Sequence, residues 1–463
     1  MEKYLKKTFI VLFCTMILGS VQSCKKEDKF LSAIPNNQLS VPNTLDDLNL
    51  MIRDEGTFNN SETDLSIASA DEYYPTELLW DANDEVSKNV YLWKSGDVFG
   101  TQPVSDWNYR YSAVYSSNTI LDALANIKIE AGQQNEANNI KGTALFYRAW
   151  AFYNLLQIFT MPYDSTKASS ELGIPLRLTS DFNSKSTRAN EKVCYTQVTN
   201  DLKLAISLLP ATSSFITLPT KTSASGFLAR VYLTMGDYNN ALAYSDKFLK
   251  SFNTLTDFNN LSPGSYPIAN SYLAEDVYHA AIGSIEYSTW YSKRNTIIDS
   301  VLYKSYEQND LRKSVYFWNL GNGPSFIGTF DVLRATWFCG ITTGEIYLTR
   351  AECYARLGNQ DAAMADLNTL LLKRYKTGTF IARIATSSDN ALSQILLERR
   401  KEMVFRGTRW ADLRRLNLDP KFAVTLKRNI EGITATLPPN DIRYALPIPF
   451  SEIKLSGIPQ NPR

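Results

Sequence analysis

Histidine is nearly missing from this 463-residue chain, since His279 is the only one. A metal site built from several histidines is therefore excluded, and a catalytic triad or Cys–His pair would have to use this one residue. An excess of one charge is also missing, because 48 Lys and Arg residues balance 47 Asp and Glu residues to a net charge of +1. A protein that tracks nucleic-acid phosphates needs a clear basic excess, so nucleic acid is not an expected partner.

Cysteine is scarce as well, with five residues in the whole chain. Cys14 and Cys24 lie near the amino terminus, which leaves Cys194, Cys339 and Cys353 in the body of the chain. Three is an odd number and the spacing is not that of a disulfide framework, so at least one thiol stays unpaired. We expect all three to be small buried hydrophobic residues.

The remaining composition is that of a folded protein. Hydrophobic residues make up 44% of the chain and charged residues 21%, which is typical of a globular chain and not of a disordered one. The length allows one large domain or two to three smaller ones. Aromatic residues are abundant, with 8 Trp, 26 Tyr and 22 Phe, and they supply flat side chains with an apolar face and, in Trp and Tyr, a polar edge.

The amino terminus has the pattern of a targeting segment. Three lysines precede the apolar run 9–18, which is too short to span a bilayer, and small residues then lead to Cys24. This arrangement resembles the lipobox of bacterial lipoproteins, in which the cysteine is acylated and becomes the first residue of the mature chain. We predict a signal peptide over residues 1–23 and a lipid anchor on Cys24, the alternative being an ordinary secretory signal cut near Ser23.

Hydrophobic periodicity predicts long amphipathic helices in the mature chain. The periodic segments are residues 41–54, capped near Asn43 or Thr44, and residues 105–128, 138–159 and 193–209. Pro162 and Pro210 follow the last two segments and are expected to end them. No stretch beyond the targeting segment is long and apolar enough to cross a membrane.

An internal repeat is the clearest sign of organisation. Residues 229–243 align without gaps on residues 351–365, and Gly236 falls on Gly358. The order of small residue, aromatic residue, turn glycine and alanine is that of tetratricopeptide repeats. Two antiparallel helices joined by a tight turn need a residue that tolerates positive φ at the bend and small residues where the backbones approach.

The chain therefore divides into helical repeats and irregular segments. We predict repeats over about 222–250 and 344–373, and irregular segments over about 60–104 and 253–340, where Gly, Pro, Asn and Ser separate short aromatic runs. Within the second irregular segment, residues 314–320 followed by Gly321 predict a strand and a turn. The proline-rich residues 431–463 are also expected to be irregular. Long irregular regions on a helical scaffold are typical places for ligand binding.

Further motifs follow one another along the chain. They are residues 107–118, the aromatic run 146–153 before Pro162, residues 345–352, residues 398–415, and the closing residues 444–449 with 460–462. Together they resemble the SusD/RagB family of Bacteroidetes outer-membrane nutrient-binding lipoproteins, and the resemblance covers essentially all of residues 24–463. Two positions depart from the family pattern: Arg406 stands where an acidic residue is usual, and Thr342 where arginine is common.

The resemblance implies a single mostly α domain over residues 24–463: a tetratricopeptide-like helical-repeat scaffold with a large irregular, short-strand-containing ligand-binding face. It also implies a non-catalytic protein without a cofactor, lipid-anchored in the outer membrane and facing outward. Such proteins capture an oligosaccharide and pass it to a SusC-like TonB-dependent transporter. Peptide capture, as in the RagB branch, and a lipid-anchored scaffold that binds only protein remain the alternatives.

A sugar ring presents C–H bonds on one face and hydroxyls at its rim, so an exposed aromatic ring makes a suitable platform. Platforms are expected on the irregular segments, and the candidates are Trp80, Tyr266, Tyr272, Trp290, Tyr291 and Trp318. Tyr73 and Tyr74 are expected to have structural roles, and Trp107, Trp150 and Trp410, which lie on amphipathic helices, are expected in the core.

Other chemistry-bearing residues have simpler interpretations. Glu398 and Glu402 share a helix face, as a glycosidase pair would, but the arginines and the lysine around them favour a salt-bridged network. Asp81-x-Asn83-x-Glu85 resembles the start of a calcium loop but lacks its glycine, so no metal is expected there. His279 lies in an apolar run and is expected to be a half-buried, hydrogen-bonded side chain.

Overall fold

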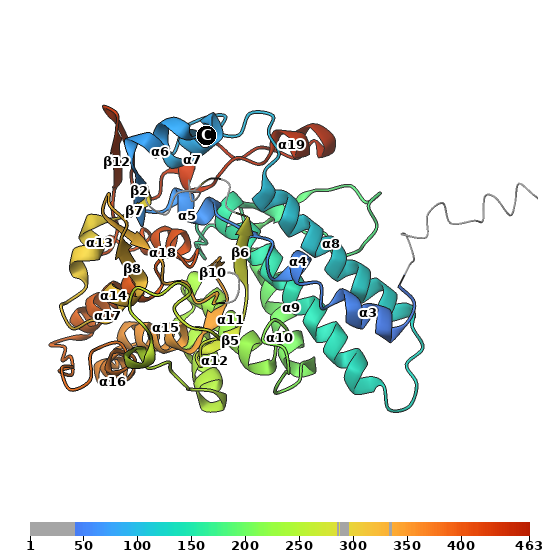
Figure 1. Ribbon diagram of the computed structural model, residues 1–463. Coiled ribbons are helices and arrows are strands. Elements are labelled where there is room, and N and C mark those ends of the chain that lie inside the picture. Colours follow the sequence, from blue (N-terminus) through green and yellow to red (C-terminus); the bar gives the residue numbers. More distant parts are fainter. Residues whose placement is uncertain (1–41, 285–286, 288–295, 333–335) are drawn as a thin grey trace, which may run out of the picture. The chain divides into compact units, whose positions relative to one another are not determined.

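The computed structural model describes residues 42–284, 287, 296–332 and 336–463 (Figure 1). Residues 1–23 and Cys24 lie outside this part of the chain. Residues Thr44–Arg463 form one compact unit. Helices dominate it, and strands of two to five residues lie between them, so the predicted fold class is confirmed.

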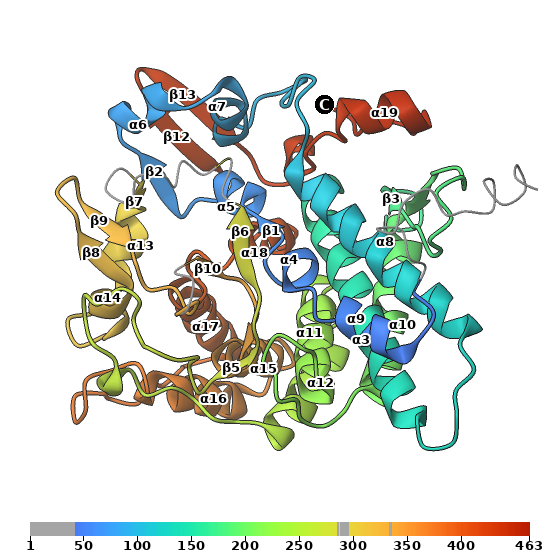
Figure 2. The same cartoon turned by 45° about the vertical axis from the view of Figure 1, so that its right-hand side comes forward.

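The long helices follow one another as a stack in which the first eight pack in succession, each on the next (Figures 1 and 2). They are α8 (Ser105–Asn126), α9 (Gln134–Phe159), α10 (Glu191–Leu208), α11 (Lys221–Thr234), α12 (Tyr238–Ser251), α15 (Thr343–Arg356), α16 (Gln360–Leu372), α17 (Ser388–Glu402) and α18 (Arg409–Leu416). The predicted helices over 105–128, 138–159 and 193–209 are confirmed. In the stack, α12 packs directly on α15 although some 90 residues separate them in sequence.

The first described helix, α3 (Leu45–Met51), begins where the sequence predicts. Thr44 caps it through a hydrogen bond accepted from the Asp47 amide, and the Asp47 side chain accepts one from the Thr44 amide. Leu45 and Leu48 are buried on its inner face. The helix is shorter than predicted.

The internal repeat corresponds to two helical hairpins, α11–α12 and α15–α16. The turn glycines Gly236 and Gly358 have φ values of 71° and 84°, a region that only glycine enters without strain. The four repeat alanines are fully or almost fully buried where the helices approach; they are Ala229, Ala241, Ala351 and Ala363. The aligned sequence pattern therefore describes the backbone correctly.

Short elements fill the rest of the chain. The shorter helices are α4 (Glu55–Phe58), α5 (Leu65–Ser69), α6 (Glu77–Ala82), α7 (Glu85–Tyr91), η2 (Phe258–Asn260), α13 (Ser300–Ser305), α14 (Arg312–Tyr316), η3 (Ile442–Tyr444) and α19 (Phe450–Ser456). The strand pairs are β2 (Tyr73–Pro75) with β7 (Thr296–Ile298), β3 (Leu172–Pro175) with β4 (Arg188–Asn190), β8 (Phe317–Asn319) with β9 (Pro324–Phe326), and β12 (Leu426–Ile430) with β13 (Ile433–Leu437), all antiparallel.

Two further sheets connect the insertion between α12 and α15 to the scaffold. The strand β6 (Ala281–Ser284) pairs with both β1 (Glu62–Thr63) and β10 (Trp337–Phe338). The strand β5 (Asp276–Tyr278) pairs with β11 (Ile341–Thr342), which leads directly into α15. The insertion thus leaves and re-enters the helical stack at neighbouring places.

Three segments contain more regular structure than the sequence predicts. Residues 60–104 form α5, α6 and α7, because Thr76 and Asp84 cap the last two with side-chain hydrogen bonds. Residues 312–316 are helical, so the strand predicted over 314–320 begins only at Phe317. The segment 431–463 contributes β13 and α19.

The core consists largely of aromatic side chains from α9. Phe146 and Trp150 pack on Phe227 of α11 and Tyr278 of β5, with ring centroids 4.6 to 5.6 Å apart. The core positions predicted for Trp107, Trp150 and Trp410 are confirmed. Cys194, Cys339 and Cys353 are buried free thiols, also as predicted.

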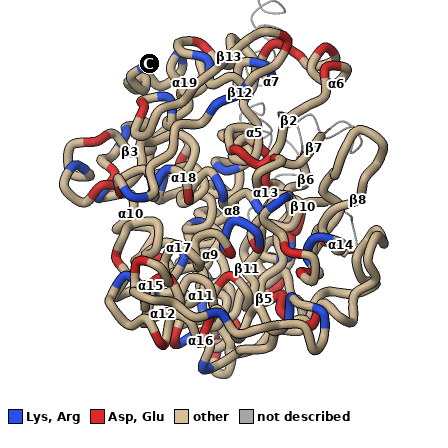
Figure 3. The backbone as a smooth tube through the Cα atoms, turned by 90° about the vertical axis from the view of Figure 1, so that its left-hand side faces the viewer, with Lys and Arg blue, Asp and Glu red and all other residues tan. Residues whose placement is uncertain are grey.

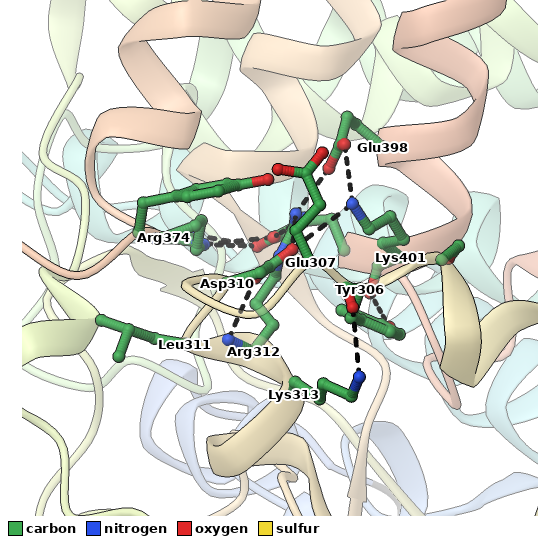
Figure 4. Close-up of polar contacts among 12 residues, drawn as sticks. Tyr306, Glu307, Asp310, Leu311, Arg312, Lys313, Arg374, Glu398 and Lys401 are labelled. Carbon is green, nitrogen blue, oxygen red and sulfur yellow. Dashed lines mark hydrogen bonds and ion pairs between the residues drawn. The ribbon is translucent and has the colours of Figure 1, made fainter. Parts of the chain in front are cut away.

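Charged positions of both signs are interspersed along the backbone (Figure 3). Several of them are nevertheless buried in one ion cluster, defined here as Glu275, Asp310, Arg312, Arg374, Glu398, Lys401 and Glu402. Figure 4 labels five of these residues, namely Asp310, Arg312, Arg374, Glu398 and Lys401. Arg312 contacts Asp310 at 2.7 Å, Glu398 at 2.5 Å and Glu402 at 3.2 Å. Arg374 contacts both Glu275 and Glu402 at 2.8 Å.

The arginines keep Glu402 of this cluster ionised. Burial opposes the charge on Glu402, but Arg374 and Arg312 outweigh burial and lower the pKa of Glu402 to about 2. Burial raises the pKa of Glu275 despite Arg374. The salt-bridged network predicted for Glu398 and Glu402 is confirmed, although its main arginines come from distant parts of the chain.

Arg406 and Thr342, the two residues that depart from the pattern of the family the sequence resembles, contact each other. Arg406 Nη1 donates to Thr342 Oγ1 at 3.1 Å, and the guanidinium lies 3.9 Å from the centroid of the Phe330 ring. Thr342 Oγ1 also caps α15 by accepting from the Glu345 amide. The position that carries arginine in the family is therefore a helix cap here.

Replacing Arg374 with methionine should lower the free energy of unfolding by about 3 kcal/mol, because two carboxylates, Glu275 and Glu402, lose their shared counter-charge while staying buried. Urea denaturation measures this loss. The matched control is Lys421→Met, since Lys421 pairs with Asp389 on the exposed surface and its loss should change the free energy of unfolding little. Equal losses in the two variants would contradict the importance of the buried cluster.

Candidate functional site

Trp318 is the most exposed of the predicted platforms that the structure describes. It lies in β8, which forms a hairpin with β9. The neighbouring Phe317 and its cross-strand partner Phe326 are buried, while the Trp318 side chain points away from them and is 52% exposed. The hairpin thus holds an indole ring at the surface on a packed base.

A second aromatic side chain lies in an adjacent pair of strands. Tyr74 is 44% exposed in β2, opposite Ile297 of β7, whereas its neighbour Tyr73 is buried. The strand β7 packs on β9 as well as on β2, so the two pairs of strands are neighbours (Figure 2). We call β2, β7, β8 and β9 the strand surface. The alternation of a short strand is the signal that separates Tyr73 from Tyr74.

The other predicted platforms have different surroundings. Trp80 is only 3% exposed, because α6 turns it toward α7, where its ring centroid lies 5.7 Å from that of Tyr91. It is a core residue in this structure and offers no free face. Trp290 and Tyr291, which precede β7, lie outside the described residues.

Tyr266 and Tyr272 belong to one group around the single histidine. Tyr266 is 38% exposed, and burial together with the charge of Asp331 raises its pKa to about 12. The half-buried Tyr272 ring lies 4.7 Å from the His279 ring, centroid to centroid. His279 contacts Asp276 at 2.6 Å and Asp331 at 3.3 Å. We call these five residues the histidine cluster.

His279 is more buried than expected, at 4% exposure. Burial disfavours the charge, but hydrogen bonds to Asp276 and Asp331 outweigh it and raise the pKa of His279 to about 9. Burial raises the pKa of Asp276, while the bonds from His279 and Thr336 overcome burial and lower that of Asp331. The cluster is a buried group of hydrogen-bonded side chains, on which the ring of Tyr272 packs.

A groove that sequence reasoning missed lies along α8. Its volume is about 410 Å³, and α8, the loop 176–187 between β3 and β4, and α19 form its walls. Tyr115 and Phe182 are 51% and 79% exposed at its sides, and Trp107 lies at its base. Phe182 stands alone in a polar, non-periodic loop, and such an isolated aromatic residue is the signal that could have indicated it.

Carboxylates do not assemble a hydrolytic or metal-binding site in the described part of the chain. Glu398 and Glu402 face arginines in the buried ion cluster. Asp81 and Glu85 lie in two different helices, with Asn83 at the junction between them. Across the described ranges there is no group of three or more His, Cys, Asp and Glu side chains placed to hold a metal ion.

None of the helices in the described ranges has the length and apolarity needed to cross a membrane. The fold and its surface define the class of this protein: a helical-repeat protein with aromatic rings displayed on inserted strands and loops.

Family models give the more particular identification. The model described as "Starch-binding associating with outer membrane" matches residues 25–233, and the model described as "SusD family" matches residues 334–463. The chain belongs to the SusD/RagB family.

Individual relatives are distant in sequence. The SusD-like protein P2 of Formosa agariphila is 23% identical over 424 residues, which covers 77% of this chain and 79% of that protein. A SusD superfamily structure from Bacteroides thetaiotaomicron has a TM-score of 0.73 at 23% identity and covers 91% of this chain and all of its own. A SusD-like carbohydrate binding protein from Bacteroides vulgatus has a TM-score of 0.67 at 20% identity, with 90% and 97% covered.

The raised pKa of His279 predicts a specific pH dependence of stability. The folded pKa of about 9 exceeds the ordinary value of 6.5, so the stabilisation is complete below pH 6.5 and disappears as the pH rises through 9. The difference in unfolding free energy between wild type and His279→Gln should therefore shrink by about 3 kcal/mol over this range.

Urea denaturation at a series of pH values measures that difference. Burial raises the pKa of Glu72 to about 8 and that of Glu191 to about 7, but both titrate in the two proteins and cancel. A difference that stays constant from pH 6 to pH 9.5 would show that His279 is neutral when buried.

Proposed function

We propose that this protein captures an oligosaccharide at the cell surface and delivers it to a SusC-like TonB-dependent transporter of the outer membrane. The observation that carries the proposal is the half-exposed Trp318 ring on the strand surface, with Tyr74 on the adjacent pair of strands. An indole face buries the C–H face of a pyranose ring and leaves the hydroxyls to polar neighbours. Stacking of this kind gives moderate affinity, which suits a ligand that must be released again.

The charge distribution fits a neutral ligand. Figure 3 shows acidic and basic positions mixed along the chain, and the formal charge of the whole chain is +1. A strongly anionic or cationic polymer would select for a surface of the opposite sign. The relative from Bacteroides vulgatus described as carbohydrate binding supports the same ligand class.

Attachment to the membrane completes the proposal. One matching family model is described as associating with the outer membrane. Signal cleavage before Cys24 and acylation of that cysteine would fix the protein there, since each buried CH₂ group contributes about 0.8 kcal/mol. Release of the glycan would follow docking on the transporter. We expect no catalysis, because Glu398 and Glu402, the carboxylate pair spaced like that of a glycosidase, contact arginines.

Trp318→Ala should weaken binding to the preferred glycan at least tenfold, the equivalent of about 1.4 kcal/mol, because the stacking face is removed. Affinity electrophoresis of the purified protein in gels that contain starch, laminarin or xylan identifies the ligand and measures the loss. The melting temperature should not change, since the side chain is half exposed.

Phe215→Ala is the matched control, because this ring is 49% exposed but belongs to neither the strand surface nor the groove. If no glycan retards the protein and peptides bind to it, the ligand is a peptide and not a sugar. If neither glycans nor peptides bind, the function is that of a scaffold that binds only protein.

Cys24→Ser should release the protein from the membrane fraction, since the thiol that carries the lipid is gone. Fractionation of cells with immunodetection measures the distribution. Cys194→Ser is the control, because that buried thiol carries no lipid and its loss should leave the protein in the membrane fraction. Membrane retention of the Cys24 variant would show that another segment anchors the chain.

A further inference from the structure

The groove along α8 is formed by elements that side-chain hydrogen bonds fix in place. Asn118 Nδ2 donates to the carbonyl oxygens of Arg177 and Thr179, at 2.9 and 3.2 Å. Asp122 accepts from the amide and the hydroxyl of Ser180, both at 2.7 Å. The loop 176–187 is therefore held against α8, and it presents Phe182, 79% exposed, toward the groove.

The polar groups of the groove select the ligand chemistry. Arg177 donates to Ser184 O and Ser186 Oγ, and Arg188 donates to the carbonyl oxygens of Leu172, Gly173 and Pro459. These guanidinium donors are engaged, so the groove is a poor site for phosphate or carboxylate. Two guanidinium groups nearby also disfavour a cationic ligand.

Glu452 of α19 supplies the acceptor. Its side chain is half-buried in the groove wall and forms no ion pair with a described residue. A carboxylate can accept hydrogen bonds from two neighbouring hydroxyls of one sugar ring. Asn108 and Ser112, exposed on α8, add neutral donors and acceptors. The volume of about 410 Å³ is within the range of small-molecule sites.

We propose that this groove is a second sugar site, in which Tyr115 and Phe182 bury the faces of a neutral pyranose ring and Glu452 accepts from its hydroxyls. The inference rests on the proposed function for its ligand class, but it uses a different surface. Figures 1 and 2 place β8 at one side of the molecule and α8 with the β3–β4 loop at the other. Two separated sites let the protein hold a long polysaccharide at two points, or two chains at once, and so raise avidity for polymers.

Affinity electrophoresis in starch, laminarin and xylan gels tests the proposal with four variants of the purified protein. The groove variant is Tyr115→Ala with Phe182→Ala, the platform variant is Trp318→Ala, and the third combines all three substitutions. The fourth is Glu452→Gln, which keeps the shape of the side chain and removes the strong acceptor. Tyr109→Ala is the matched control, since this ring is 41% exposed on the same helix but does not line the groove.

We expect the groove variant to bind the retarding polysaccharide about tenfold more weakly than wild type, and Glu452→Gln to weaken binding in the same direction. The platform variant should keep residual binding that the combined variant loses. Unchanged melting temperatures show that each variant is folded. A groove variant that binds like wild type would overturn the second site and leave the proposed function intact. Wild-type protein that no glycan retards would overturn both.

Discussion

Two buried arginines join the strand-containing insertion to the helical stack, and the position of the exposed indole depends on them. Arg312 begins α14 in the insertion and contacts Glu398 and Glu402 of α17. Arg374, after α16, reaches back to Glu275 just before β5. The strand β8 follows α14 without a break, so Trp318 lies only six residues from Arg312. Because buried ion pairs tolerate little displacement, they fix the place where the insertion meets the scaffold.

This arrangement explains which parts of the structure could be predicted from sequence. The helices and the repeat could be predicted because they depend on local sequence patterns. A turn glycine such as Gly236 or a helix cap such as Thr44 acts on residues only a few positions away. The partners of Glu398 and Glu402 could not be predicted, since Arg312 lies 86 residues before Glu398 and nothing local identifies it. The sequence indicated that a network exists but not which segments it joins.

The candidate sites, too, could be predicted from sequence only in part. The sequence predicted Trp318 as a platform because it lies in an irregular segment, and the structure places it at an exposed position of β8. Trp80 was misjudged, because a single turn of helix capped by Thr76 buries a side chain that an irregular segment would expose. The groove was missed since its walls come from three segments that only the fold brings together. The hydrogen bond from Arg406 to Thr342 likewise joins two residues from distant parts of the chain, so local sequence could not indicate it.

The direct packing of α12 on α15 has a consequence for how such proteins diversify. The helices on either side of the insertion contact each other directly, so the two ends of the insertion are held close together. Loops of very different length cost little extra entropy once their ends are held together. Natural variation can therefore change the exposed turns of the insertion, such as the one between β8 and β9, while residues such as Tyr278 and Arg312 stay buried against the helices.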